Sequence, residues 1–476
     1  MRPIRQNPLS EQERAWLHEE TLRVLEDVGV TFGAPEALDI LEAAGAVVDR
    51  TTAHARLPRQ LVEDCLASVP RQARLAGRDP ARDLVLGDGS RLACCTDGQG
   101  TLVRDDPGGA VREATLADVR DALRLCDALP EIDFMWTSLT APELDASTAG
   151  LEVAALTLRE STKHLQDVSP KTPAEVPYLL EMLEAAAGGS LWDRPIYSLL
   201  DCSVSPLQRD PESTAACIEL CRSGVVVCIC ALPQMGTTAP LTPAGTSVVC
   251  LAEILSGVVL YQLAQPGCAL VAMPMPGGSD MRSGSYLGGS PEVAVANTMC
   301  VEMCRSWGLP TIGSGSTNDA KAPDYRAGAE NLLLWMSVAQ AGADGLVAAA
   351  FCDGSRVFSP AKAVLDADAL GMLQRFLETS PVDAAATLFD DIAAVGSGGH
   401  FLGRTSTRRL AREGGVWTPR VLRHDPAADA QGRDLVEAAA ARAAELVAMH
   451  QPRPLPADVE RTMDDAIRRY AASRRD

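Results

Sequence analysis

The feature that most constrains the fold of this chain is a repeated alternation of apolar, strand-like runs with helical segments from about residue 115 onward. Near-continuous apolar runs are typical of parallel strands covered on both faces. Eight runs, each followed by a helical segment, predict a (β/α)8 barrel, whereas an open doubly wound sheet would alternate without a fixed count of eight. The predicted strands are residues 133–139, 163–169, 195–204, 225–233, 268–276, 310–317, 343–351 and 391–401.

The segments outside this alternation predict two additions to the barrel. Residues 1–114 are expected to form an N-terminal extension of helices and one β-hairpin, the first helix opening at the capping box Ser10–Glu13 and the hairpin spanning 92–106. The barrel is expected over 115–425. Residues 426–476 are expected to form two amphipathic helices that serve packing or contact between copies in a homo-oligomer.

Composition indicates which classes of partner to expect and which cellular compartment. A formal net charge of −20 over 476 residues argues against binding to nucleic acid or to an anionic membrane surface. The 14 cysteines lie in apolar runs such as 225–233, which indicates buried free thiols and a reducing cytoplasm. The N-terminus lacks the apolar segment of a secretory signal, and no charge-free apolar run has the length of a membrane span.

Barrel active sites lie at the carboxyl ends of the strands, so the loops there carry the candidate residues. These loops have no phosphate-binding loop, because GSGS and GSGG lack the following Lys-Ser/Thr, and no GxSxG nucleophile elbow. Several aromatic residues near strand ends either form a cage for a quaternary ammonium group or belong to the core. The candidate substrate-binding residues are Trp136, Gln166, Ser205, Gln234, Arg282, Tyr286, Asp319 and Phe351.

Three pairs of cysteines are candidate metal ligands by their spacing. Two pairs have helical spacing and one has strand spacing, but none has a nearby His or a second CxxC pair. We therefore expect no bound metal and interpret these thiols as small buried hydrophobic groups, with a zinc-dependent thiol or alcohol demethylase as an alternative. The pairs are Cys217 with Cys221, Cys300 with Cys304, and Cys228 with Cys230.

Long loop motifs in a fixed order give the chain a family resemblance. They are SPLQRDPESTAACIELC at 205–221, DMRSGSYLGGSPE at 280–292, GSGSTNDAKAPDYRAGAE at 313–330 and GSGGHFLGRTST at 396–407. With them the chain resembles the trimethylamine methyltransferase family over most of its length. The resemblance implies a (β/α)8 barrel that moves a methyl group from a methylamine to the cobalt of a corrinoid (cobalamin) held by a separate carrier protein. No DxHxxG-type corrinoid-binding pattern occurs in this chain, which agrees with a cofactor supplied by a partner.

The same resemblance implies which kind of methyl donor the chain uses, and leaving-group chemistry supports that choice. Founding members of the family use pyrrolysine, which is absent here, so the chain resembles the non-pyrrolysine branch that demethylates quaternary amines such as glycine betaine. A quaternary ammonium leaves as a neutral amine without an acid, whereas a tertiary methylamine must first be protonated or captured. Arg282 is expected either to clamp a betaine carboxylate or to form a loop ion pair, and Asp319 either to contact substrate or to pair with Lys321.

His400 is the candidate catalytic residue, because it matches the GGHFL motif of the family and is expected at the end of the eighth strand. Its contact would be the corrinoid edge or the substrate, and Gly398, Gly399 and Phe401 are expected to face the corrinoid. A tertiary methylamine as donor, or a non-catalytic barrel that binds a methylammonium compound, are the remaining alternatives.

Overall fold

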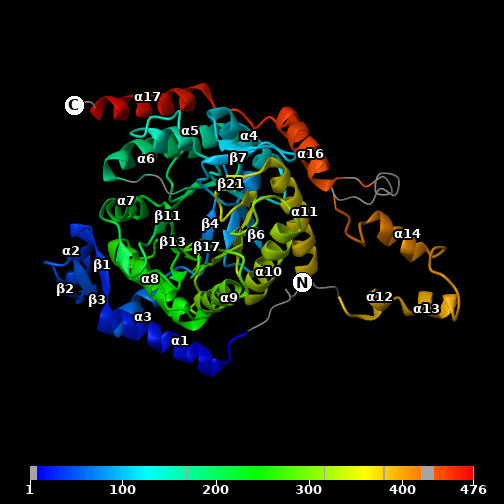
Figure 1. The fold of residues 1–476 in the computed structure, drawn as a ribbon, viewed down its shortest axis with the longest axis horizontal. Coiled ribbons are helices and arrows are strands. Elements are labelled where there is room, and N and C mark those ends of the chain that lie inside the picture. Colours follow the sequence, from blue (N-terminus) through cyan, green and yellow to red (C-terminus); the bar gives the residue numbers. More distant parts are fainter. Residues whose placement is uncertain are drawn as a thin grey trace.

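The computed structural model describes residues 8–167, 170, 172–315, 317–378, 381–419, 432 and 434–474. Eight parallel strands pair in chain order, and β19 pairs with β6. A bridge between Ala272 and Thr311 links the remaining two edges, so the sheet forms a ring with helices around it (Figure 1). The predicted (β/α)8 barrel is confirmed. Its strands are β6 (Ala93–Thr96), β9 (Phe134–Trp136), β10 (His164–Asp167), β11 (Tyr197–Cys202), β13 (Val226–Ala231), β15 (Leu270–Pro274), β18 (Ile312–Ser314) and β19 (Gly345–Ala349).

The prediction of the eighth strand at 391–401 is wrong. That segment contains part of the short helix α13 (Phe389–Val395) and an exposed turn. The strand that completes the ring is β6, which the sequence analysis placed in a hairpin. Its four residues are all buried, and so short an apolar run gives little periodic signal. The first barrel strand therefore lies within 1–114, and the three-part division of the chain stays a prediction.

Inward-pointing side chains fill the ring, and a hairpin closes one end. Strands β4 (Ala73–Leu75) and β5 (Leu84–Leu86) contribute to the same apolar cluster as the inner faces of the barrel strands. Figure 1 shows β4 near the centre of the ring. His164, the first residue of β10, bonds the carbonyl of Ala76, so the hairpin covers the amino ends of the strands. The carboxyl ends form the opposite mouth.

The N-terminal segment packs outside the barrel. Helix α1 (Glu11–Arg23) starts at the predicted capping box, with Ser10 and Glu13 bonded reciprocally. A small sheet joins β1 (Val30–Phe32), β2 (Val47–Asp49) and β3 (His54–Arg56) to β12 (Gln208–Arg209), while α1, α2 (Pro35–Ala43) and α3 (Arg59–Ser68) contact α8. Helix α8 (Pro243–Ala264) is long and apolar enough to cross a membrane, but 78% of that window is buried inside the fold. It is a core helix of this protein.

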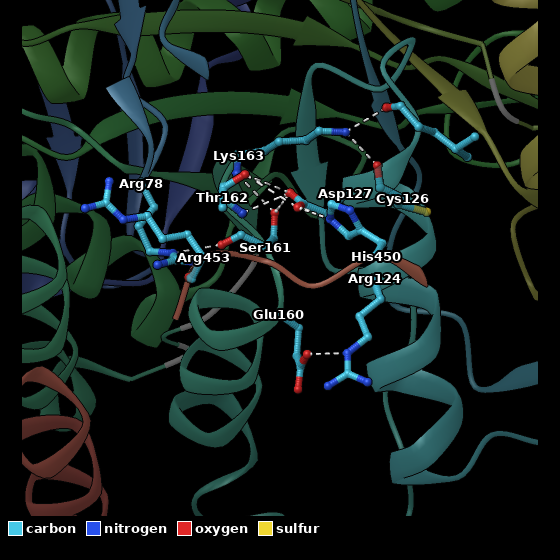
Figure 2. A network of polar contacts seen from close by, with 11 residues as sticks. Arg78, Arg124, Cys126, Asp127, Glu160, Ser161, Thr162, Lys163, His450 and Arg453 are labelled. Carbon is cyan, nitrogen blue, oxygen red and sulfur yellow. Dashed lines mark hydrogen bonds and ion pairs between the residues drawn. The ribbon is translucent and has the colours of Figure 1, made fainter. Parts of the chain in front are cut away.

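Two C-terminal helices pack on the outside of the barrel. Helix α16 (Leu435–Met449) packs on α11 (Pro360–Leu377) and α4 (Leu116–Ala128), and α17 (Ala457–Ser473) packs on α6 (Val176–Ala187) and α5 (Ala149–Glu160). A buried polar network joins the segment between them to the start of β10 (Figure 2).

Residues 381–419 form a separate excursion that we call the arm. It carries α12 (Ala384–Thr387), α13 and α14 (Thr405–Arg412) and extends away from the barrel beside α11 (Figure 1). None of its residues belongs to the three core clusters. The arm includes the whole stretch around His400.

Candidate active site at the barrel mouth

Two small sheets frame the mouth. One joins β14 (Gln234–Met235), β16 (Gly277–Ser279) and β17 (Tyr286–Leu287), all from loops that follow β13 and β15. The other joins β20 (Phe351–Cys352) and β21 (Val357–Phe358) to β7 (Leu102–Arg104) and β8 (Val111–Glu113), between β19 and β6. Backbone pairing therefore fixes loops that would otherwise move, and the side chains on them have set positions.

Trp136 ends β9 at the mouth and is almost fully buried. Its indole ring lies so close to Gly98, in the loop after β6, that a Cβ atom there would come within 2.2 Å of the ring. The indole Nε1 atom has no hydrogen-bond partner among the described residues. Asp97, also buried, accepts a hydrogen bond from the backbone amide of Gly98 at 2.8 Å. A carboxylate and an indole ring thus lie on adjacent strands at the mouth.

Tyr286 brings a second ring to the mouth from β17. Its ring covers Gly277 and contacts Gly354, where a Cβ atom would come within 2.6 Å and 3.0 Å of it. Burial raises the pKa of Tyr286 to about 12, a hydrogen bond with Thr317 acts against this, and the carboxylate of Asp97 adds to it. The phenol is therefore protonated at neutral pH.

Gln166 of β10 ends a line of polar groups inside the barrel. His164 Nδ1 lies 3.1 Å from the carbonyl of Ala76 and donates to it, so Nε2 accepts from Ser198 Oγ at 2.9 Å. Burial lowers the pKa of His164 to about 4, which keeps the ring neutral. The Gln166 amide contacts Ser198 and Cys228 with Oε1, while its Nε2 has no hydrogen-bond partner among the described residues. The Nε2 end of this buried amide is therefore available to donate a hydrogen bond to another group.

A further contact joins the carboxyl ends of β6 and β10. Gln99 Nε2 donates to Asp167 Oδ1 at 2.7 Å, and Asp167 is fully buried. The loop after β6 therefore contributes Asp97, Gly98 and Gln99 to the mouth. These residues are absent from the predicted site because DGQG is typical of a hairpin turn; a strand at the apolar ACC just before it would place them at a strand end.

Four other predicted site residues hold loops instead of facing the lumen. Ser205 Oγ donates to Glu253 on α8 at 2.8 Å, which anchors the loop after β11. Gln234 Oε1 accepts from Ser279 at 3.2 Å and ties β14 to β16. Of the remaining two, Asp319 holds a loop of the rim and Phe351 lies in the outer core.

Asp319 accepts from the backbone amides of Gly288 and Gly289 at 2.8 and 3.3 Å, just after Tyr286. Lys321 pairs with Asp353 and not with Asp319. Asp319 therefore fixes the loop that carries the Tyr286 ring.

Phe351 packs edge-on against Phe358 at a centroid distance of 5.6 Å and belongs to the core cluster outside the barrel lumen. Arg282 is exposed in the loop after β16. Its backbone amide donates to Asp280, but among the described residues its side chain forms no ion pair with Asp280 or Glu292. The structure thus brings Trp136, Gln166 and Tyr286 together and leaves Phe351 and Arg282 outside the lumen.

The predicted position of His400 at a barrel strand is wrong, because His400 lies exposed on the arm. Gly396 and Gly398 have φ values of +68° and +79° with open space around them, so they serve the turn that ends α13. Gly399 packs on Val395 of the same helix. None of His400, Gly398, Gly399 and Phe401 lies at the mouth of its own barrel, and their roles stay predictions.

The paired cysteines lie in packed interiors. Cys217 and Cys221 on α7 (Pro211–Arg222), like Cys300 and Cys304 on α9 (Pro291–Ser306), are buried, and burial raises the pKa of the Cys217 and Cys304 thiols far above the usual value. Within the described part of the chain, no group of three or more His, Cys, Asp or Glu side chains has the arrangement to hold a metal ion.

Fold and mouth together define the class: a (β/α)8 barrel with a candidate site at the carboxyl ends of the strands, where aromatic rings and carboxylates lie. The family model described as trimethylamine methyltransferase (MTTB) matches residues 2–474. The chain belongs to the trimethylamine methyltransferase family, and its composition without pyrrolysine agrees with the non-pyrrolysine branch.

Curated relatives agree with this membership, and a solved structure agrees with the fold. The trimethylamine methyltransferase MttB of Desulfitobacterium hafniense (strain DSM 10664 / DCB-2) is 29% identical over 462 residues, covering 96% of this chain and 92% of the relative. The glycine betaine methyltransferase of Desulfitobacterium hafniense (strain Y51) is 28% identical over 406 residues, covering 85% and 84%. The Methanosarcina barkeri monomethylamine methyltransferase (MtmB) structure aligns with a TM-score of 0.55 at 10% identity, covering 98% and 88%, and shows the fold alone.

Proposed function

We propose that this protein transfers a methyl group from a methylated ammonium compound to the cobalt of a corrinoid carried by a separate protein. The observation that carries the proposal is the joint placement of the Trp136 and Tyr286 rings and the Asp97 carboxylate at one barrel mouth. Aromatic faces attract ammonium groups by about 0.5–2 kcal/mol each, and a buried carboxylate adds charge attraction. Such a site favours a cation.

The donor that fits best is a quaternary amine with an oxygen function, such as glycine betaine. Trp136 and Gln166 are register partners on adjacent strands, and each has a side-chain nitrogen without a hydrogen-bond partner among the described residues. Buried donors of this kind need an acceptor, which a betaine carboxylate supplies. The relative that is a glycine betaine methyltransferase supports the same donor.

The rim of the mouth suits a flat, largely apolar cofactor edge and its carrier. Exposed apolar side chains stand on the loops that follow β11, β13, β14 and β16, namely Val204, Leu232, Leu241 and Met281. A corrinoid supplies a reduced cobalt centre that is nucleophilic toward methyl groups. The protein's own residues would hold the ammonium group and exclude water from the reacting methyl, and the C–N electron pair would leave with the neutral amine.

The cysteines and the net charge bear on the compartment and the partners of this protein. All 14 cysteines are free thiols, which supports a reducing cytoplasm as the compartment. The acidic chain supports a small-molecule substrate and a protein partner over nucleic acid.

The test mixes the purified protein with reduced cobalamin and a panel of donors: glycine betaine, longer betaines and trimethylamine. The readouts are methylcobalamin absorbance and the demethylated amine by mass spectrometry. We expect glycine betaine or another betaine to give both products, and Trp136→Leu to lose most of the rate. Absence of methylcobalamin with every donor would overturn the proposed activity, and turnover of trimethylamine alone would overturn the quaternary donor.

A further inference from the structure

The outward face of one barrel helix is apolar where a solvent-facing surface is usually polar. On α10 (Tyr325–Ala341), Tyr325, Ala329, Leu332 and Leu333 follow helical spacing and are all exposed, Tyr325 to 92%. A helix that faces water on this side would carry charged or polar residues there. Exposed apolar faces are typical of surfaces that bind another protein, a ligand or a membrane.

The neighbouring helix carries two more exposed apolar side chains. Met372 and Phe376 lie one turn apart on α11, which contacts α10, and they are 42% and 47% exposed. We call the six residues Tyr325, Ala329, Leu332, Leu333, Met372 and Phe376 the α10–α11 stripe. Helix α11 ends one residue after Phe376, and the arm follows it within a few residues.

The arm carries a matching set of apolar side chains. Phe389, Ile392, Leu402 and Val416 are between 51% and 82% exposed. Asp391 on α13 pairs with Arg404 and bonds Ser406 at the start of α14, so the two short helices are fastened to each other. The arm is thus a folded element without a core of its own.

We propose that the arm of one copy of this chain packs on the α10–α11 stripe of a second copy. Both faces belong to the same chain, and the arm starts next to Phe376, at one end of the stripe. Trp417, near the far end of the arm, contacts α11 again at Gly371. If a two-fold axis lies beside α11, two chains can exchange arms. Each exchange then buries the apolar side chains of one arm against the α10–α11 stripe of the other chain.

Charge favours the arm as the contact element. Residues 381–419 contain four acidic residues and four arginines, so the arm is neutral and the rest of the chain carries the net −20. Two acidic bodies repel each other, whereas a neutral arm with the basic helix α14 can approach an acidic body. The acidic residues are Asp383, Asp390, Asp391 and Glu413, and the arginines are Arg404, Arg408, Arg409 and Arg412.

The first test is sedimentation of the full chain. We expect the wild type to be a dimer or a larger assembly of dimers. Two double variants, Leu332→Glu with Leu333→Glu in the stripe and Phe389→Glu with Ile392→Glu in the arm, are each expected to weaken association by about tenfold or more. The matched control is Val28→Glu with Val47→Glu, two valines that are each 55% exposed outside both faces; it should associate like the wild type. Circular dichroism checks that each variant is folded.

The second test identifies the contact. A photoreactive amino acid at position 402 is introduced into chains labelled with 15N, which are mixed with unlabelled chains and irradiated. We expect cross-linked peptides that join the arm to α10 or α11 and contain both isotopes. Each of four results would overturn the proposal. The wild type could be a monomer, or the assembly could survive both double variants. Cross-links could form within one chain only, or the arm variants could lose only the binding of a separate carrier protein.

Discussion

His450 Nε2 lies 2.7 Å from a carboxylate oxygen of Asp127, although 323 residues separate the two in sequence. Asp127 also accepts from Ser161 Oγ at 2.8 Å and from the amide of Thr162 at 2.9 Å (Figure 2). Burial acts to raise the pKa of Asp127, but the charge of Lys163 and these hydrogen bonds outweigh it and lower the pKa. The contact fastens the segment between α16 and α17 to the barrel.

Replacing this histidine should loosen the C-terminal helix. His450→Ala removes the short hydrogen bond to a buried carboxylate oxygen that keeps only a long bond from Thr162 Oγ1, which costs about 1–3 kcal/mol of unfolding free energy. Hydrogen exchange should speed up in α17 before it does in the barrel strands. Arg442→Ala on α16, which removes an exposed ion pair with Glu445, is the control and should change stability by less than about 0.5 kcal/mol. Equal protection of α17 in both variants would contradict the assigned contact.

The buried pair Arg209–Asp201 predicts a non-additive double mutant. Both side chains are 1% exposed, and Arg209 also donates to Ser256 Oγ and to the carbonyl of Glu253. Arg209→Met leaves the Asp201 charge buried alone and should cost about 3–5 kcal/mol, whereas the double variant Arg209→Met with Asp201→Leu should recover much of that loss. Urea unfolding of the four proteins measures the cycle, and additive losses would rule out the expected coupling.

Acid should destabilise the protein through His164. Its pKa is about 4 in the folded state against an ordinary value of 6.5, so the unfolded chain binds more protons between these values. Stability therefore falls as the pH drops from about 6.5 toward 4, by on the order of 3 kcal/mol from this group. Unfolding free energy measured across this range should fall less steeply in His164→Gln. An unchanged slope in that variant would mean that other groups cause the acid sensitivity.

Gly98 should be needed for activity more than for stability. A methyl group at this position collides with the Trp136 ring, so Gly98→Ala is expected to displace the ring and to lower methyl transfer by about a hundredfold. Gly403→Ala on the arm, where a Cβ atom meets nothing within 4 Å, is the matched control. Rates are compared together with thermal melting. If the Gly98→Ala enzyme is as active as the control, the assignment of Trp136 to the active site is wrong.

Seven of the eight strands could be predicted because parallel strands buried on both faces have long apolar runs. The run DIAAV at 391–395 gave a false signal, since five residues with two alanines fit a short exposed helix equally well. The site was predicted in part: Trp136, Gln166 and Tyr286 lie at the mouth, whereas Phe351 follows β19 yet turns toward the outer core. Side-chain direction at a strand end depends on register and on the next turn, which local sequence does not specify.

By itself, the sequence determined the barrel, the family and the two C-terminal helices, because apolar periodicity and long loop motifs are local properties of the chain. Only the tertiary structure decided which strand closes the ring, that Gly98 makes room for Trp136, and that His400 lies on an arm outside the barrel. Each of these depends on contacts between residues distant in sequence. Such contacts follow from strand register and from which apolar faces meet, and no single segment encodes either.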